Sequence, residues 1–136
     1  MVIDSRTAYG FGARIEAPYD EAVDRVKRAL QGEGFGVLWE IDVRRTLKEK
    51  RGVDFRKYVI LGACNPQLAH QILVAEIDVG LLLPCNVVVY EVDGGSVVEA
   101  LDPEVALGLV RNDALAPLAA EAKERLGRAL AEVARG

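Results

Sequence analysis

The chain has 136 residues, of which 51% are hydrophobic and 28% are charged, and its formal net charge is −4. This length supports one hydrophobic core and is short for two, so we expect a single domain over residues 1–136. The acidic balance argues against binding to nucleic acid or to an anionic membrane, because both rest on an excess of Lys and Arg.

The first half of the chain predicts alternating strands and helices. Apolar residues alternate over 9–17, which indicates a half-buried strand, and Pro18 then opens a helix that Gly32 and Gly34 end. A second alternating segment, residues 35–43, predicts the next strand.

Two more elements follow before the middle of the chain. Asp42 can cap a short basic helix over residues 43–51, which Gly52 ends. Residues 58–63 are apolar on both faces and predict a third strand in the centre of the sheet.

The second half begins with a helix signal at Asn65 and Pro66, an N-cap followed by the N1 position that proline favours, and this helix is expected to reach about Asp78. The remaining predicted elements are a hairpin of residues 86–92 and 96–101, a helical turn over 103–109 and a long helix over 114–134. Together they favour an α+β fold with helices on one face of a mainly antiparallel sheet.

Nearly all the soft, titratable chemistry lies in one segment, which contains Cys64, His70 and Cys85. Cys64 precedes the predicted helix, where the positive end of the helix dipole can lower a thiol pKa. If strands 58–63 and 86–92 are antiparallel neighbours, the two cysteines lie at the same end of the sheet. In a parallel crossover they would lie at opposite ends, and a shared site would not form.

Four interpretations of this segment remain open. A metal site would use Cys64, Cys85 and His70, although their spacing matches no standard ligand motif. A redox pair would join the two thiols, without a C-x-x-C motif. Nucleophilic catalysis by Cys64 with His70 as the base would leave Gln67 or Glu76 to orient the histidine. The structural interpretation, which we favour, makes both cysteines small buried hydrophobes and places His70 at a half-buried helix border.

Three other features have plain structural interpretations that we also favour. A basic cluster holds seven of the 17 basic residues, and we expect a solvated surface rather than an anion site: Arg44, Arg45, Lys48, Lys50, Arg51, Arg56 and Lys57. The sequence around Gly10 and Gly12 lacks the other residues of a phosphate-binding loop. These two glycines therefore indicate close packing within a strand. Trp39 and Tyr90 are expected in the core, with a ligand cavity as the alternative.

The expected location is cytoplasmic. The first six residues lack the apolar segment of a secretion signal, and no apolar run reaches the roughly 20 residues that cross a bilayer. Two cysteines in such a chain indicate reduced thiols rather than a disulfide framework. One methionine and many arginines favour a thermophilic source.

Several segments resemble one known family, the bacterial and archaeal domain of unknown function 302. The resemblance lies in residues 41–43, 47–48, 58–66 and 80–91, and includes Cys64-Asn65-Pro66 and Leu83-Pro84-Cys85. It implies a TATA-box-binding-protein-like arrangement in the order β-α-β-β-β-β-α with extra short helices, and a homodimer. It implies no reaction. His70 does not belong to the resemblance, and the likeness of fold does not imply DNA binding.

The sequence therefore predicts a non-catalytic domain that binds a small ligand or ion at the Cys64–Cys85 end of the sheet. The expected ligand-binding residues are Cys64, Asn65, His70, Cys85 and Tyr90. The alternatives are a thiol redox or sensor protein that uses the two cysteines, and a dimeric interaction module. The residues identify no cofactor.

Overall fold

The computed structural model describes residues 4–136. Its main elements are a strand, a helix, four strands and a helix: β2 (Gly10–Ile15), α1 (Tyr19–Gly32), β3 (Gly36–Asp42), β4 (Tyr58–Cys64), β5 (Cys85–Val92), β6 (Gly95–Leu101) and α5 (Ala116–Arg135). The shorter elements are β1 (Asp4–Ser5), α2 (Val43–Arg51), α3 (Pro66–Ala75), the 3₁₀ helix η1 (Ile77–Leu82), α4 (Pro103–Gly108) and the 3₁₀ helix η2 (Asp113–Leu115). The predicted α+β class and the order of its elements are confirmed.

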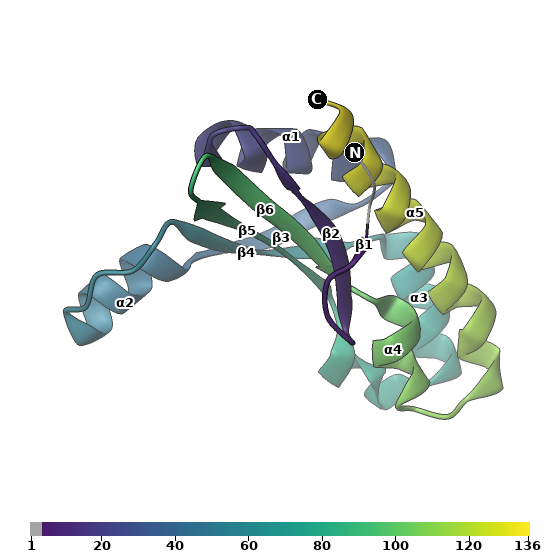
Figure 1. Cartoon of the computed structure of the whole chain (residues 1–136). Helices are drawn as coiled ribbons and strands as arrows, with labels where there is room; N and C mark the ends of the chain where they lie inside the picture. The colour runs from purple at the N-terminus through teal and green to yellow at the C-terminus, as the bar shows by residue number, and fades with distance from the viewer. Residues whose placement is uncertain (1–3) are drawn as a thin grey trace.

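The six strands form one antiparallel sheet in the order β1-β2-β6-β5-β4-β3 (Figure 1). β4 lies between β5 and β3, which confirms the central position expected from its apolar faces. β3 is an edge strand, and its register with β4 shifts between Val37 and Trp39.

Helices α1 and α5 pack against one face of the sheet, which we call the covered face (Figure 1). Alternate strand residues enter this core, and the register aligns Leu61, Val87 and Ala100 across β4, β5 and β6. Leu30 of α1 and Leu126 of α5 close the core from the helix side and are fully buried. A second buried cluster joins α3, η1, α4, η2 and the first turn of α5, and its members are Ile72, Val79, Leu107, Leu115 and Ala119.

The helix-start signals of the sequence act as expected. Oδ1 of Asp42 accepts a hydrogen bond from the Arg45 N–H at the start of α2. Asn65 does the same for the Leu68 N–H at the start of α3, with Pro66 at its first position. These caps satisfy backbone donors that have no partner inside the helix.

Two predicted helix boundaries are wrong. α3 ends at Ala75, not near Asp78, because Glu76 is extended (φ −152°, ψ 99°) and the chain continues as η1. The last helix begins at Ala116, and the residues before it form η2, whose start is capped by the Asn112 side chain.

The other face of the sheet carries apolar side chains that lie outside both buried clusters, and we call it the open face. Its half-buried and exposed members are Trp39, Ile41, Tyr58, Ile60, Val88 and Tyr90, and Val97, which pairs with Tyr90, is a buried member of the same face. The expectation that Trp39 and Tyr90 belong to the core is wrong, since Trp39 is 43% exposed and Tyr90 is half-buried. The Trp39 indole lies across Gly62, where an added Cβ would be 2.6 Å from the ring.

Helix α2 and the loop after it, residues 43–57, form a segment that we call the arm. Figure 1 shows α2 projecting away from the end of the sheet, at the left of the view. Each residue of α2 is exposed or half-exposed, in contrast to α1 and α5. The positive φ of Gly52 (66°) ends the helix and turns the chain back toward β4.

Gly12 has a structural role in the sheet. A Cβ at this position would collide with the carbonyl oxygen of Val98 on β6. The absence of a side chain therefore allows β2 and β6 to approach each other, as expected for glycine in a strand.

Candidate functional site

The antiparallel pairing of β4 with β5 brings the two cysteines to one end of the sheet. Ala63 pairs with Cys85, and Cys64 follows Ala63 directly. The antiparallel pairing that a shared site of the two cysteines requires is therefore present. Both thiols are free and partly exposed.

A pocket of about 150 Å³ lies at this end of the sheet, against α3 and α5. Both cysteines line it, together with eleven other residues: Phe35, Leu38, Ala63, Asn65, Leu68, Ala69, Ile72, Leu73, Leu83, Pro84 and Ala122. Apart from the two thiols, Asn65 supplies the polar side chain of this lining. The wall is therefore almost wholly hydrocarbon.

The pocket holds its thiols in the neutral form. Burial raises the pKa of Cys64 above its ordinary value. Burial, with a smaller contribution from Cys64, raises the pKa of Cys85 to about 11. Desolvation thus outweighs the helix N-terminus that was expected to lower the pKa of Cys64.

The side chain of Asn65 is engaged in contacts within the protein. Its side-chain oxygen accepts the Leu68 N–H at 3.2 Å, and its amide group lies close to Gly34, whose φ is +84°. Within residues 4–136, every buried side-chain nitrogen or oxygen has a hydrogen-bond partner. The pocket therefore presents no free buried polar group to a ligand.

His70 and Tyr90 lie apart from this pocket. His70 is exposed on α3, which corrects the half-buried position expected from the helix pattern. Tyr90 lies on the open face near the other end of β5, where its hydroxyl donates to Glu99 at 3.4 Å. Across the described part of the chain, no three His, Cys, Asp or Glu side chains are grouped so that they could hold a metal ion.

Sequence reasoning missed most of the pocket wall. Phe35, Leu83 and Ala122 come from three distant parts of the chain, and each reads as an ordinary core residue. The two proline-containing motifs beside the cysteines were the available signal, since Asn65-Pro66 starts α3 and Pro84 precedes Cys85. The Leu83–Pro84 peptide bond is cis.

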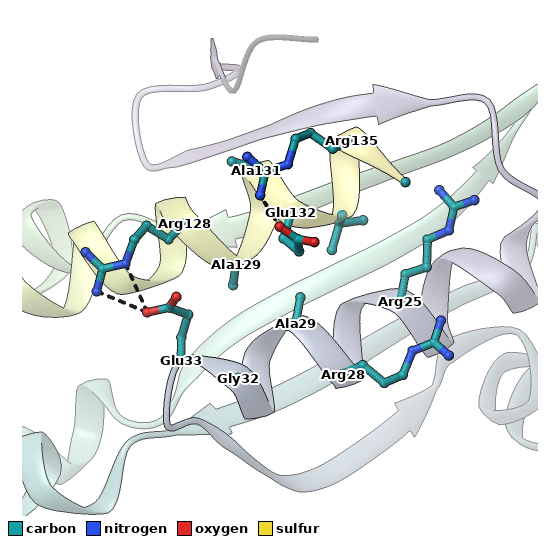
Figure 2. Close-up of a pocket in the computed structure, with 12 residues that line it drawn as sticks. Arg25, Arg28, Ala29, Gly32, Glu33, Arg128, Ala129, Ala131, Glu132 and Arg135 are labelled. Atoms are coloured by element: carbon teal, nitrogen blue, oxygen red, sulfur yellow. Dashed lines mark hydrogen bonds and ion pairs between the residues drawn. The ribbon is translucent and has the colours of Figure 1, made fainter.

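A second hollow, of about 630 Å³, lies between α1 and α5 (Figure 2). It is lined by four arginines, Arg25, Arg28, Arg128 and Arg135. Ion pairs connect this group to four glutamates, Glu21, Glu33, Glu124 and Glu132. Figure 2 shows Arg128 turned toward Glu33, at 3.0 Å. Of these glutamates, Glu33 and Glu132 line the hollow, so its wall carries more arginine than glutamate, and the ion pairs neutralise part of that excess.

The basic cluster of the arm is also partly paired. Arg45 contacts Glu49 at 3.1 Å, and Lys48 contacts Asp54 at 3.1 Å. Such exposed pairs contribute little to stability. The guanidinium of Arg56 lies 5.7 Å from the centre of the Tyr90 ring, within cation–π distance.

Comparison with known proteins identifies one family. The model described as "Domain of unknown function DUF302" matches residues 11–133. The crystal structure of an uncharacterized conserved protein DUF302 from Bacillus stearothermophilus is similar, with 35% identity and a TM-score of 0.86. The match covers 93% of this chain and 98% of that chain. No curated protein matches. Within the described residues, no helix is both long and apolar enough to cross a membrane.

Proposed function

The chain belongs to the DUF302 family, and we propose that it is a non-catalytic domain that binds a small, neutral, apolar molecule in the Cys64–Cys85 pocket. The observation that carries the proposal is the hydrocarbon wall of a pocket of about 150 Å³. An apolar cavity of roughly this size holds a ligand such as benzene.

Apolar ligands are favoured over ions for two reasons. Moving a charged group into a pocket without a charged or free polar partner has a large desolvation cost. In addition, burial keeps the Cys85 thiol protonated at neutral pH, and it is the thiolate that binds a metal. Removal of a proton would have to accompany metal binding.

The same pKa values weigh against the redox alternative. A reactive cysteine has a low pKa and an electropositive environment, whereas burial raises the pKa of both thiols here. Titration with a thiol reagent before and after exposure to an oxidant tests this alternative. Equal reactivity in the two states would remove it, and loss of both thiols together would support it.

Benzene is a suitable probe for the proposed pocket. We expect saturating benzene to raise the Tm of the native chain by a few degrees, since a ligand that binds only the folded state stabilises it. NMR shifts should concentrate at Leu68 and Ala69. In the variant Ala69→Leu, which fills the pocket, both effects should disappear.

Ala120→Leu is the matched control, because Ala120 is exposed on α5 and does not line the pocket. This variant should respond to benzene as the native chain does. An unchanged Tm together with unchanged pocket resonances in the native chain would contradict the proposal.

A second candidate function is a homodimeric interaction module, and the open face supports it. Exposed apolar side chains in a contiguous patch mark interaction surfaces in proteins. Trp39 and Ile41 are each 43% exposed on this face. Sedimentation equilibrium over a wide range of concentrations tests the candidate: a concentration-dependent mass supports a dimer, and a monomer throughout removes it.

A further inference from the structure

The two thiols of the pocket have no hydrogen-bond acceptor. Cys64 and Cys85 both line the pocket of about 150 Å³, and both are free. Burial raises the pKa of each thiol, so both sulfurs carry a hydrogen at neutral pH. Within residues 4–136, neither sulfur takes part in a hydrogen bond. The pocket therefore holds two weak S–H donors that the chain itself leaves unused.

The rest of the wall adds an aromatic ring and aliphatic groups. Phe35 is 4% exposed and lies in the wall among aliphatic side chains. The side-chain oxygen of Asn65 already accepts the Leu68 N–H at 3.2 Å. A molecule in this pocket therefore meets mainly two neutral sulfurs, the Phe35 ring and hydrocarbon.

These groups favour a ligand with π electrons. Sulfur makes favourable contacts with aromatic rings, often at the ring edge. The face of an aromatic ring is electron-rich and accepts weak hydrogen bonds. Two aromatic rings in contact also gain more than the burial of their surfaces provides. An aliphatic molecule of the same size offers none of these three contributions.

We propose that the ligand of this pocket carries a single neutral aromatic ring, which the thiols of Cys64 and Cys85 and the ring of Phe35 recognise. This inference rests on the proposed function and names the class of its ligand. The volume limits the occupant to about one ring, since an apolar cavity of roughly this size holds benzene.

An irregularity of β3 connects the pocket with the surface. Leu38 lies between Val37 and Trp39, where the register of β3 with β4 shifts, and it has no partner in that register. The same residue lines the pocket and is 60% exposed. Such bulges often redirect a side chain next to a functional site. A substituent on the ring can leave the pocket past Leu38, so the ring can belong to a larger molecule.

Hydrophobicity alone predicts the opposite preference. Cyclohexane has more apolar surface than benzene, so the burial of area favours cyclohexane in a purely aliphatic pocket. A preference for benzene therefore has to come from the sulfurs and the Phe35 ring. Comparison of these two compounds separates the recognition of an aromatic ring from the filling of an apolar space.

NMR titration of the full chain with benzene and with cyclohexane tests the inference. The amide resonances of Leu68 and Ala69, which both line the pocket, report its occupancy. We expect benzene to bind the native chain at least ~3-fold more tightly than cyclohexane, an effect of the size of one sulfur–aromatic contact. Equal affinities, or tighter binding of cyclohexane, would overturn the inference.

The double variant Cys64→Val/Cys85→Val removes both thiols and keeps the pocket apolar. Valine suits these positions, because Cys64 ends β4 and Cys85 begins β5. Cyclohexane should bind this variant at least as tightly as benzene does. A preference for benzene equal to that of the native chain would show that the thiols play no part in recognition, and the inference would fail.

Two single variants keep the test decisive if the double variant does not fold. Cys64→Ala and Cys85→Ala each remove one sulfur without adding volume, and circular dichroism shows whether each is folded. Each should reduce the preference for benzene over cyclohexane by ~2-fold or more. A full native preference in both single variants contradicts the assigned role of the thiols.

Leu73→Val is the matched control. Leu73 lines the pocket, and its replacement slightly enlarges the space while both thiols and Phe35 remain. This variant should retain the native preference for benzene. Loss of the preference here would overturn the inference, because recognition would then depend on the shape of the wall rather than on its sulfurs.

The outcomes distinguish this inference from the proposed function. If neither compound shifts the Leu68 and Ala69 resonances of the native chain, both are wrong. If cyclohexane binds the native chain as well as benzene does, the pocket takes apolar molecules as proposed, and the aromatic class alone is wrong.

Discussion

The two faces of the sheet are made of similar side chains and have opposite surroundings. On the covered face, Leu61, Val87 and Val89 are sealed by α1 and α5. On the open face, Ile41, Ile60 and Val88 are left half-covered or exposed. Strand composition alone does not decide burial, because the helices determine which face enters the core. The open face is thus the part of the sheet that remains available for contact with another chain.

Truncation of one residue on each face gives the largest expected difference. Leu61→Ala should lower the free energy of unfolding by about 3 kcal/mol, because Leu61 is fully buried and its removal leaves a cavity. Ile41→Ala should cost less than about 1 kcal/mol in the monomer. Urea denaturation at low protein concentration measures both. Equal losses would show that the two faces are buried alike.

The free energy of unfolding should also depend on pH through Cys85, which lies at the pocket end of the sheet. Its pKa is raised to about 11 in the folded chain, against an ordinary value near 9. Between pH 9 and 11 the unfolded chain loses this proton first, so stability falls as pH rises, by up to about 2 kcal/mol.

Urea denaturation of the native chain and of Cys85→Ala from pH 8 to 11 measures this contribution. The difference between the two should shrink as pH rises through this window. Tyr19, whose pKa burial and nearby acidic groups raise to about 12, affects both proteins alike. A constant difference would mean that Cys85 is not held in its neutral form.

The two N-caps compare the body of the protein with the arm. Asn65→Ala should cost about 1 kcal/mol of global stability, because α3 packs in the second core cluster. Asp42→Ala removes an equivalent cap from α2, and it should leave the global unfolding midpoint of the monomer unchanged. Thermal denaturation at low concentration separates the two, and an equal loss would show that the arm is part of the core.

Gly62→Ala should have a small effect on stability and a clear effect on the exposure of Trp39. The added Cβ would lie 2.6 Å from the Trp39 indole, which can swing into solvent because it is 43% exposed. We expect a stability loss below about 1 kcal/mol, with increased quenching of Trp39 fluorescence by acrylamide. Unchanged quenching with a large loss of stability would place Trp39 in a rigid, buried environment.

Local signals in the sequence predicted much of the fold. Pro18, Asp42 and Asn65 marked helix starts, and Gly52 marked the end of α2, where the structure gives it a φ of +66°. These features depend on a few neighbouring residues. The approach of the two cysteines also followed from one assumption, that β4 and β5 are antiparallel, which is confirmed.

Features that depend on distant packing were not predictable. Trp39 has the spacing of a core residue, but it lies on the face without helices. The wall of the pocket comes from segments far apart in the sequence, and His70 turned outward although it lies on an apolar helix. The cytoplasmic location, the thermophilic source and the single-domain organisation stay predictions.

The emission of Trp39 tests most directly whether a second copy covers the open face. It is the single tryptophan of the chain and lies on that face. If a second copy covers it, emission should shift to longer wavelength as the protein is diluted, and Ile41→Lys, which places a charge on the same face, should show the diluted spectrum at every concentration. A spectrum independent of concentration, and equal in the native chain and Ile41→Lys, would contradict the account.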